Sequence, residues 1–273
     1  REDRCAGFTG RLVKDGALRL PPLLKGSVWI SAAGPSVTEG RGPAEAPLRG
    51  ALLCHHSRLA FPVLPPDAST DRELALASGS WRPASAIGLA SDVSRYEAAM
   101  RLAPRASVDY RLMARRPSSA PAGLDAPLPR GAAVRRALGS DLDALLPLQE
   151  AYEREEVLTP IHEFNAAACR ASLARALERQ LVVLAEEGGV VVAKAGTNAR
   201  GLAVDQVGGV YTLPARRGRG LAAALVAYLV AQIEAAGRRA SLFVKPHNAP
   251  ARALYRGLGF VELDDFRASY YEA

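Results

Sequence analysis

A turn rich in glycine and arginine, Arg217-Gly218-Arg219-Gly220, joins two segments of different character. Residues 206–212 before it are mostly apolar, as in a buried strand, and residues 221–236 after it form an alanine-rich run typical of a helix. Glycines let the backbone approach phosphate oxygens, and the exposed amides and the dipole of a helix N-terminus favour negative charge. Because a phosphate-binding loop requires this order of strand, turn and helix, the turn predicts a pyrophosphate site.

A second stretch follows that helix. Residues 241–244 are apolar and indicate a buried strand, and residues 250–258 indicate a short helix that ends at a glycine. Asn248, between the two, is placed either to bind a ligand amide or to cap the helix. Tyr255 follows two turns later and offers a phenolic hydroxyl as a proton donor.

Together the two stretches resemble the signatures of the GNAT superfamily of N-acetyltransferases, in the same order along the chain. The pyrophosphate signature is matched by Arg217, Gly220 and Ala222. The second signature is matched by Asn248, Ala251, Tyr255, Gly259 and Phe260. The resemblance covers residues 131–273 and implies an α/β fold with a mixed sheet, the acyl-CoA N-acyltransferase fold of this family.

The resemblance implies a site for acetyl-CoA as the acyl donor. The pantetheine amides would pair with the free backbone of Val210, Tyr211 and Thr212 in the manner of an added strand. The Val210 N–H would also polarise the acetyl carbonyl and stabilise its oxyanion. Two glycines at 208 and 209 fit this picture, because glycine in a strand marks a bulge or a close backbone approach. The pyrophosphate would lie on the turn and the first residues of the helix, which are Arg217, Gly218, Arg219, Gly220, Leu221 and Ala222.

For catalysis, the resemblance implies that Tyr255 is the general acid that protonates the departing thiolate. The pKa of a phenol, about 10, lies close enough to that of a thiol, about 8.5, for this transfer. A tyrosine that only packs its ring against the sheet is the structural alternative. Asn248 is implied to contact the pantetheine, and a simple helix cap is its alternative.

The general base is not identified by the sequence. Histone-acetylating members of the family carry a glutamate on the strand before the turn, and Gln206 stands at that position here. Asp205 is adjacent but faces the opposite side of a strand. Glu155 and Glu156 lie between the first two expected helices of this half, where the family often forms its acceptor site. A water relay without a single base is a further alternative.

A segment rich in Pro, Ser and Ala divides the chain. We expect a linker at residues 117–130, the acetyltransferase domain at 131–273 and a smaller α/β domain at 1–116. In the first half we expect strands at 27–31, 51–56, 59–64, 84–89 and 108–114, with helices at 69–78 and 92–102.

This order repeats that of the second half from its first hairpin onward, so we interpret the first half as a degenerate GNAT-like copy. Pro65-Pro66-Asp67 stands where a second glycine turn would follow, so we expect this copy to have lost cofactor binding. In the second half we expect strands at 133–138, 180–185, 190–195, 206–212, 240–244 and 266–271, and helices that begin at 140, 164, 221 and 250.

Composition and residue spacing argue against several classes of function. The net charge of the 273 residues is +7, but the arginines are spread along the chain and aromatic residues make up only 6%, so we expect no nucleic-acid partner. No apolar run reaches the ~18–20 residues of a membrane helix, and no apolar region follows the charged N-terminal residues as in a signal peptide. The three cysteines lack the spacing of metal ligands, so we expect no metal and a reducing, cytoplasmic location. Side chains in Cys54-His55-His56 alternate across a strand and do not converge on one ion.

The sequence therefore predicts an acetyl-CoA-dependent N-acetyltransferase in which an amine, most simply that of a small molecule, attacks the thioester directly. The alternative is a non-catalytic sensor that binds acetyl-CoA in one half and a metabolite or partner in the other. We expect a monomer or a homodimer. The acceptor and the length of the acyl group are left open.

Overall fold

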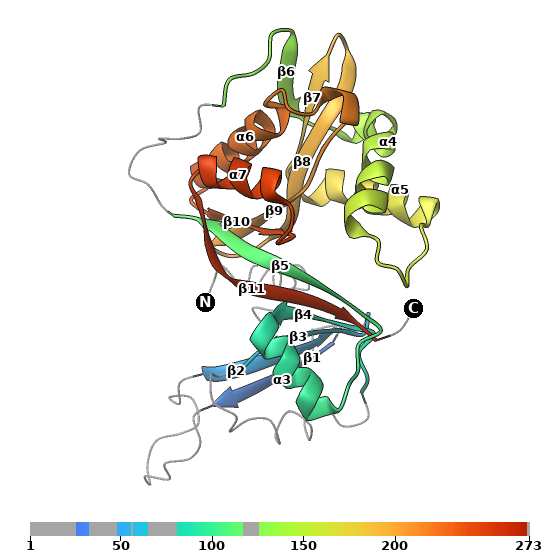
Figure 1. Ribbon diagram of the computed structural model, residues 1–273, viewed down its shortest axis with the longest axis vertical. Helices are drawn as coiled ribbons and strands as arrows, with labels where there is room; N and C mark the ends of the chain where they lie inside the picture. Colours follow the sequence, from blue (N-terminus) through green and yellow to red (C-terminus); the bar gives the residue numbers. More distant parts are fainter. Residues whose placement is uncertain (1–25, 33–47, 56, 65–80, 117–125, 272–273) are drawn as a thin grey trace. The chain divides into compact units, whose positions relative to one another are not determined.

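The computed structural model describes residues 26–32, 48–55, 57–64, 81–116 and 126–271. These ranges form a mixed α/β fold that divides into two compact units (Figure 1). The first unit contains the described residues of 111–264, and the second contains those of 26–110 together with 265–271. No helix in these ranges is long and apolar enough to cross a membrane.

The first unit is built on a mixed sheet with the strand order β5-β10-β9-β8-β7-β6. The three strands β7, β8 and β9 form consecutive antiparallel pairs, whereas β10 runs parallel to β9 and antiparallel to β5. The bounds are β5 Ala106–Arg115, β6 Ala132–Arg136, β7 Val182–Glu187, β8 Val190–Arg200, β9 Val204–Thr212 and β10 Arg239–Val244. Strands β6 to β10 correspond to strands predicted in the second half of the chain, whereas β5 corresponds to the strand predicted at 108–114 in the first half. The mixed α/β class is confirmed.

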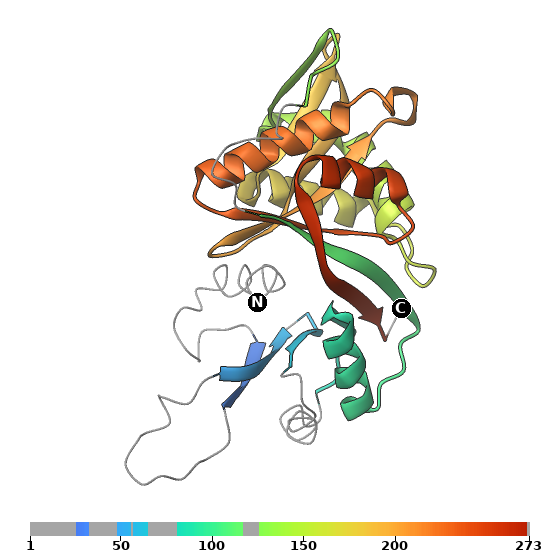
Figure 2. The same cartoon turned by 60° about the vertical axis from the view of Figure 1, so that its left-hand side comes forward.

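Helices cover both faces of this sheet (Figures 1 and 2). Alternate residues of β7 point to opposite faces of the sheet. Val183 and Ala185 pack in one core cluster, and Val182 and Leu184 pack in the other. The first cluster contains side chains of α6 and α7, and the second contains side chains of α4 and α5. The helices are α4 Leu142–Tyr152, α5 Ala166–Arg179, α6 Leu221–Ala235 and α7 Ala249–Gly257.

The central helix α6 follows directly from its sequence. It is rich in Ala and Leu, which have high helix propensity, and it begins at Gly220, whose φ of 83° is in the left-handed region. Gly237, with a φ of 71°, follows its last turn. Leu225, Leu229 and Ile233 are fully buried, so this helix contributes a large share of the core.

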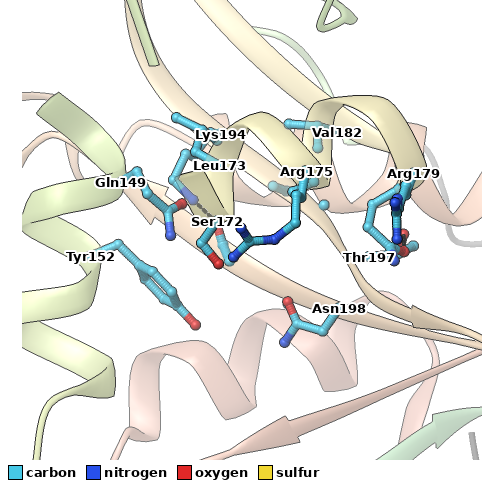
Figure 3. A pocket seen from close by; sticks show the side chains of 16 residues that line it. Gln149, Tyr152, Ser172, Leu173, Arg175, Arg179, Val182, Lys194, Thr197 and Asn198 are labelled. Carbon is cyan, nitrogen blue, oxygen red and sulfur yellow. Dashed lines mark hydrogen bonds between the residues drawn. The ribbon is translucent and has the colours of Figure 1, made fainter. Parts of the chain in front are cut away.

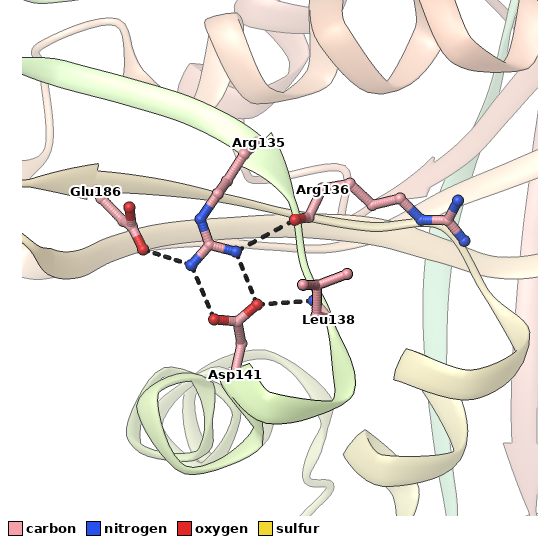
Figure 4. Close-up of polar contacts among 5 residues, drawn as sticks. All are labelled: Arg135, Arg136, Leu138, Asp141 and Glu186. Atoms are coloured by element: carbon pink, nitrogen blue, oxygen red, sulfur yellow. Dashed lines mark hydrogen bonds and ion pairs between the residues drawn. The ribbon is translucent and has the colours of Figure 1, made fainter.

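An ion cluster joins the start of α4 to the sheet (Figure 4). Arg135 of β6 binds both carboxylate oxygens of Asp141 at 2.8 Å and Glu186 of β7 at 2.6 Å. Asp141 also accepts a hydrogen bond from the Leu138 N–H at 2.7 Å. The hydrogen bonds from Arg135 are the main cause that lowers the pKa of Asp141. Asp141 lies at the end of the short helix η4 Gly139–Asp141, so the predicted helix start near residue 140 is anchored by this charge.

The second unit has the strand order β1-β2-β3-β4-β11. Its pairs run antiparallel, antiparallel, parallel and antiparallel, which is the same series of directions as β7-β8-β9-β10-β5 in the first unit. Its helix α3 Ala90–Met100 packs through Val93 and Tyr96. The strands are β1 Gly26–Ala32, β2 Leu48–His55, β3 Leu59–Val63, β4 Ser85–Leu89 and β11 Phe260–Tyr270. The helix expected at 69–78 and the Pro65-Pro66-Asp67 segment lie outside the described residues.

The last strand of each half pairs with the sheet of the other half. Arg111–Ala114 of β5 pair with β10, and Phe266–Tyr270 of β11 pair with β4. The strand expected at 266–271 is thus longer than predicted and begins at Phe260. The two halves of the chain therefore exchange their last strands, and the compact units divide inside β5 and β11, whereas the domain boundaries predicted at 116 and 131 follow chain order.

Candidate functional site

The strands β9 and β10 separate toward their carboxyl ends. They are paired only from Val204 with Arg239 to Val207 with Leu242, although β9 continues to Thr212. Beyond Val207, β9 pairs only with β8 among the described strands. Residues 208–212 therefore pair with no strand on the side away from β8, although side chains bind the carbonyls of Gly209 and Thr212, and an extended ligand is able to pair there. Val210, Tyr211 and Thr212 all lie in this segment, where the sequence predicts the pantetheine.

A β-bulge lies inside the same segment. Lys194 is paired with Tyr211 and Gly196 with Gly208, so Gly209 and Val210 together stand opposite one residue of β8. Gly209 has a φ of 60°, which a residue with a side chain rarely adopts. The glycine pair in this strand predicts such a bulge, and the bulge is present. The extra residue leaves the Val210 N–H out of the regular ladder.

The glycine–arginine turn connects β9 to α6 through the short helix η6 Pro214–Arg216. Gly218 and Gly220 both have positive φ, of 75° and 83°. The first backbone hydrogen bond at the start of α6 runs from the Ala224 N–H to the Gly220 carbonyl at 3.0 Å. The amides of the preceding helical residues point out of the helix end, as they do at any helix N-terminus. Such an end attracts anionic groups.

The arginine side chains of the turn are engaged with carboxylates. Arg217 binds Glu155 at 2.8 Å, and its Nε donates to the Thr212 carbonyl at 3.1 Å. Arg216 and Arg219 each lie 2.9 Å from the same oxygen of Glu187. These pairs leave the backbone amides as the groups of the turn most available to an anion.

All three candidates for the general base form ion pairs, and Glu155 and Asp205 are the two least suited to accept a proton. Glu155 accepts a hydrogen bond from the Tyr211 hydroxyl at 2.6 Å, and this bond, with the one from Arg217, lowers the pKa of Glu155. Asp205 is completely buried and pairs with Arg238 at 2.9 Å. Neither carboxylate is suited to take a proton from an amine.

Glu156 differs from these two. It lies in the π-helical turn η5 Glu153–Val157 that continues α4, and it pairs with Lys245 at 3.1 Å. Its charge contributes to raising the pKa of Tyr255, so it lies near that hydroxyl. A π-helical turn is frequent at functional sites.

Tyr255 is buried in α7, with 8% of the residue exposed, and its ring lies edge-on to Phe260 with 5.9 Å between centroids. Burial first, then the nearby Tyr152 and Glu156, raise its pKa above the usual value of a tyrosine. The hydroxyl therefore stays protonated over the physiological range, but its raised pKa lies further from that of a thiol and makes Tyr255 a weaker acid. Asn248 caps α7, because its Oδ1 accepts the Ala251 N–H at 3.1 Å.

A pocket of about 460 Å³ lies between α4, α5, β8 and β9 (Figure 3). Its lining reaches the bulge at Gly208 and Gly209 and contains no Asp or Glu. The polar and charged side chains that line it are Gln149, Tyr152, Ser172, Arg175, Arg179, Gln180, Lys194, Thr197 and Asn198.

Lys194 and Tyr152 are site residues that the sequence analysis missed. The Lys194 ammonium donates to the Gly209 carbonyl at 2.9 Å and lies 4.7 Å from the centroid of the Tyr152 ring. The Tyr152 hydroxyl lies near the backbone of Gly209, which acts to lower its pKa against the larger effect of burial. One signal was available, since Lys194 is a charged residue inside the apolar run of β8.

Cys54 and His55, the described residues of Cys54-His55-His56, do not belong to a cluster of metal ligands in the described part of the chain. Burial raises the pKa of the Cys54 thiol to about 11. The His55 ring contacts the Ser57 hydroxyl at 2.7 Å through Nδ1. Across the described ranges, His, Cys, Asp and Glu side chains nowhere form a group of three that is able to hold a metal ion.

The chain matches the model of a known protein family. The model of the acetyltransferase (GNAT) family matches residues 143–260, which include β7 to β10, both signatures and the pocket. A comparison with curated proteins finds no relative.

Solved structures share the fold over almost the whole chain. A GCN5-related N-acetyltransferase-like protein from Streptococcus suis covers 98% of this chain and 100% of its own, with 15% identity and a TM-score of 0.53. A GCN5-related N-acetyltransferase from Kribbella flavida covers 97% and 96%, with 19% identity and a TM-score of 0.54. A tandem GNAT protein from the clavulanic acid biosynthesis pathway covers 97% and 88%, with 14% identity and a TM-score of 0.55.

Proposed function

Residues 143–260 belong to the acetyltransferase (GNAT) family, whose proteins use acyl-CoA, and from this premise we propose that the protein is an acetyl-CoA-dependent N-acetyltransferase. The observation that carries the proposal is the continuity of one stretch of chain. The free edge and bulge of β9 lead directly into the glycine turn and the N-terminus of α6. Acetyl-CoA has an extended thioester arm followed by a pyrophosphate, which is the same order as the strand edge and the helix N-terminus along this stretch.

Acetyl-CoA lies in this proposal along residues 208–222. Its pantetheine amides pair with the free edge at Val210, Tyr211 and Thr212, and its pyrophosphate accepts from the amides that follow Arg217. The Val210 N–H donates to the acetyl carbonyl and stabilises the negative charge that develops on its oxygen. Asn248 contributes through its side-chain amide N–H groups, because its Oδ1 is used by the α7 cap.

The amine attacks the acetyl carbon directly. The new C–N bond forms, the C–S bond breaks, and the thiolate takes a proton from the Tyr255 hydroxyl. Burial of Tyr255 favours its protonated form before this step. The nitrogen of the tetrahedral intermediate loses its extra proton to water or to Glu156, which lies near Tyr255, and the Tyr255 phenolate takes a proton back from water.

The acceptor in this proposal is the amine of a small molecule that enters the pocket at the bulge. The pocket volume of about 460 Å³ suits a small ligand, and its lining reaches Gly209, next to the proposed oxyanion donor. The lining contains no carboxylate, so no acidic side chain within the pocket is available to take the proton of the amine.

We propose further that residues 1–116 are a degenerate GNAT-like domain, joined through a linker at 117–130 to the acetyltransferase domain at 131–273. The support is the identical series of strand directions in the two units. A monomer or homodimer in the cytoplasm is part of the same proposal. The buried, unpaired thiols of Cys54 and Cys169 fit a reducing compartment.

Acetyl transfer is tested by incubating the full chain with acetyl-CoA and a panel of primary amines, with the release of the CoA thiol as the measurement. We expect release that depends on the amine, and an acetylated product by mass spectrometry. Tight binding of acetyl-CoA without transfer to any amine of a broad panel would contradict the enzyme and favour the sensor. The non-catalytic sensor is the second candidate because Gln206 stands at the position of a family glutamate.

A further inference from the structure

Lys194 is a buried cation to which the reaction above assigns no role. Only 4% of the residue is exposed, and within the described chain no carboxylate forms an ion pair with it. Removing an ammonium ion from water without a counter-ion is unfavourable. Burial accordingly lowers the pKa of Lys194 to about 8. Packing alone would favour an apolar side chain at this position of β8, so the presence of a lysine requires a different explanation.

The contacts of Lys194 are concentrated on one residue of the bulge. Its ammonium donates to the Gly209 carbonyl at 2.9 Å, and the neighbouring Tyr152 hydroxyl lies near the Gly209 backbone. The Tyr152 ring lies 4.7 Å from the ammonium and provides a favourable face for a cation. Lys194 therefore holds the bulge through the Gly209 carbonyl, and the Tyr152 ring of α4 supports its ammonium.

The Gly209 carbonyl and the Val210 N–H belong to the same planar peptide unit and point in opposite directions. A cation on the carbonyl oxygen draws electron density through the amide and makes the N–H a stronger donor. We propose that Lys194 is a positioning residue, which fixes the bulge and strengthens the Val210 N–H as the donor to the acetyl carbonyl. This inference rests on the proposed site of the acetyl group, and Lys194 acts through the peptide without touching the thioester.

The proposal has a pH dependence with a definite sign. The groups that face the ammonium are Tyr152 and Glu153 at the end of α4 and Cys169 of α5. Burial raises the pKa of both Tyr152 and Cys169 to about 12, so these two stay neutral while Lys194 titrates. The ammonium is present below pH about 8 and is lost above it. The donor strength of the Val210 N–H is therefore expected to fall as the pH rises through this value.

The direct test is the infrared stretching frequency of the bound thioester carbonyl, measured as an isotope difference with acetyl-CoA labelled with ¹³C at that carbon. Hydrogen bonding lowers this frequency. At neutral pH we expect a lower frequency in the wild type and in Lys194→Arg than in Lys194→Met. On raising the pH, the wild-type frequency shifts toward that of Lys194→Met, whereas that of Lys194→Arg does not change. Equal frequencies in the wild type and Lys194→Met would overturn the proposal.

Kinetics separate positioning from a purely structural role. Loss of one oxyanion donor costs about 10²–10³ in kcat, and Lys194 only tunes such a donor, so Lys194→Met is expected to lower kcat about tenfold. Its Kd for acetyl-CoA, measured by calorimetry, is expected to change less than kcat does, and its Tm is expected to stay that of the wild type. Weaker binding together with a lower Tm would identify a structural role and overturn the proposal. A wild type that shows the frequency shift but transfers no acetyl group would contradict the proposed enzyme and leave the Lys194 contact standing, whereas a wild type that does not bind acetyl-CoA would overturn both.

Discussion

Gly220→Glu is expected to raise the Kd for acetyl-CoA by at least about a hundredfold, which corresponds to about 2.7 kcal/mol. The new carboxylate would stand at the N-terminus of α6, where the account places the pyrophosphate, and would repel it. There is room for a side chain, because a Cβ at Gly220 meets only the Pro127 carbonyl, at 3.8 Å. Calorimetric titration of the folded variant is the measurement.

The matched control is Gly220→Ala. Both substitutions share the strain of a side chain at a φ of 83°, so Ala reports the strain and the difference between the variants reports the charge. We expect Gly220→Ala to bind within about tenfold of the wild type, since the strain of about 1–2 kcal/mol acts on folding as well as on binding. Equal affinities in Gly220→Glu and the wild type would mean that the turn does not contact the phosphates.

Tyr255→Phe is expected to lower kcat by about 10²–10⁴, the usual contribution of a positioned general acid. The substitution keeps the ring and its contact with Phe260, so folding and the Kd for acetyl-CoA should change little. The variant removes only the hydroxyl that the account places at the departing thiolate. Single-turnover measurements at saturating acetyl-CoA report the chemical step.

Tyr228→Phe in α6 is the control, because 37% of that residue is exposed and it lies outside the site. It should keep the wild-type rate. An unchanged kcat in Tyr255→Phe would show that Tyr255 is a packing residue and that the thiolate leaves without its help. The raised pKa of Tyr255 adds a second check, because the wild-type rate should show no loss from deprotonation of this tyrosine at physiological pH.

Much of this fold was predictable because local patterns decide it. The alanine-rich run after Gly220 has one dominant conformation, and the observed α6 ends one residue from the predicted end. The glycines at 208 and 209 predict the bulge for a similar reason, since a φ of 60° at Gly209 strongly favours glycine. The signatures around Arg217 and Tyr255 predict the family of residues 143–260, which the family match confirms.

The remainder depends on contacts between segments far apart in sequence. The sequence does not predict that the two halves of the chain exchange β5 and β11. The residue pattern of a strand is the same whichever sheet the strand joins. The pairing of Glu155 with Tyr211 and Arg217 spans more than fifty residues, so the sequence leaves Glu155 among the candidates for the base. Lys194 was overlooked because its importance comes from the Gly209 carbonyl across the strand pair.

The most direct measurement of the central claim is amide hydrogen exchange of the full chain with and without acetyl-CoA, followed by mass spectrometry. The account predicts slower exchange in two segments, 208–212 of β9 and 217–223 of the turn and α6, and no change in α3. Protection of both segments would locate the pantetheine and the pyrophosphate together. Binding of acetyl-CoA that protects neither segment would contradict the account, because the separated strands and the helix N-terminus would then not form the donor site.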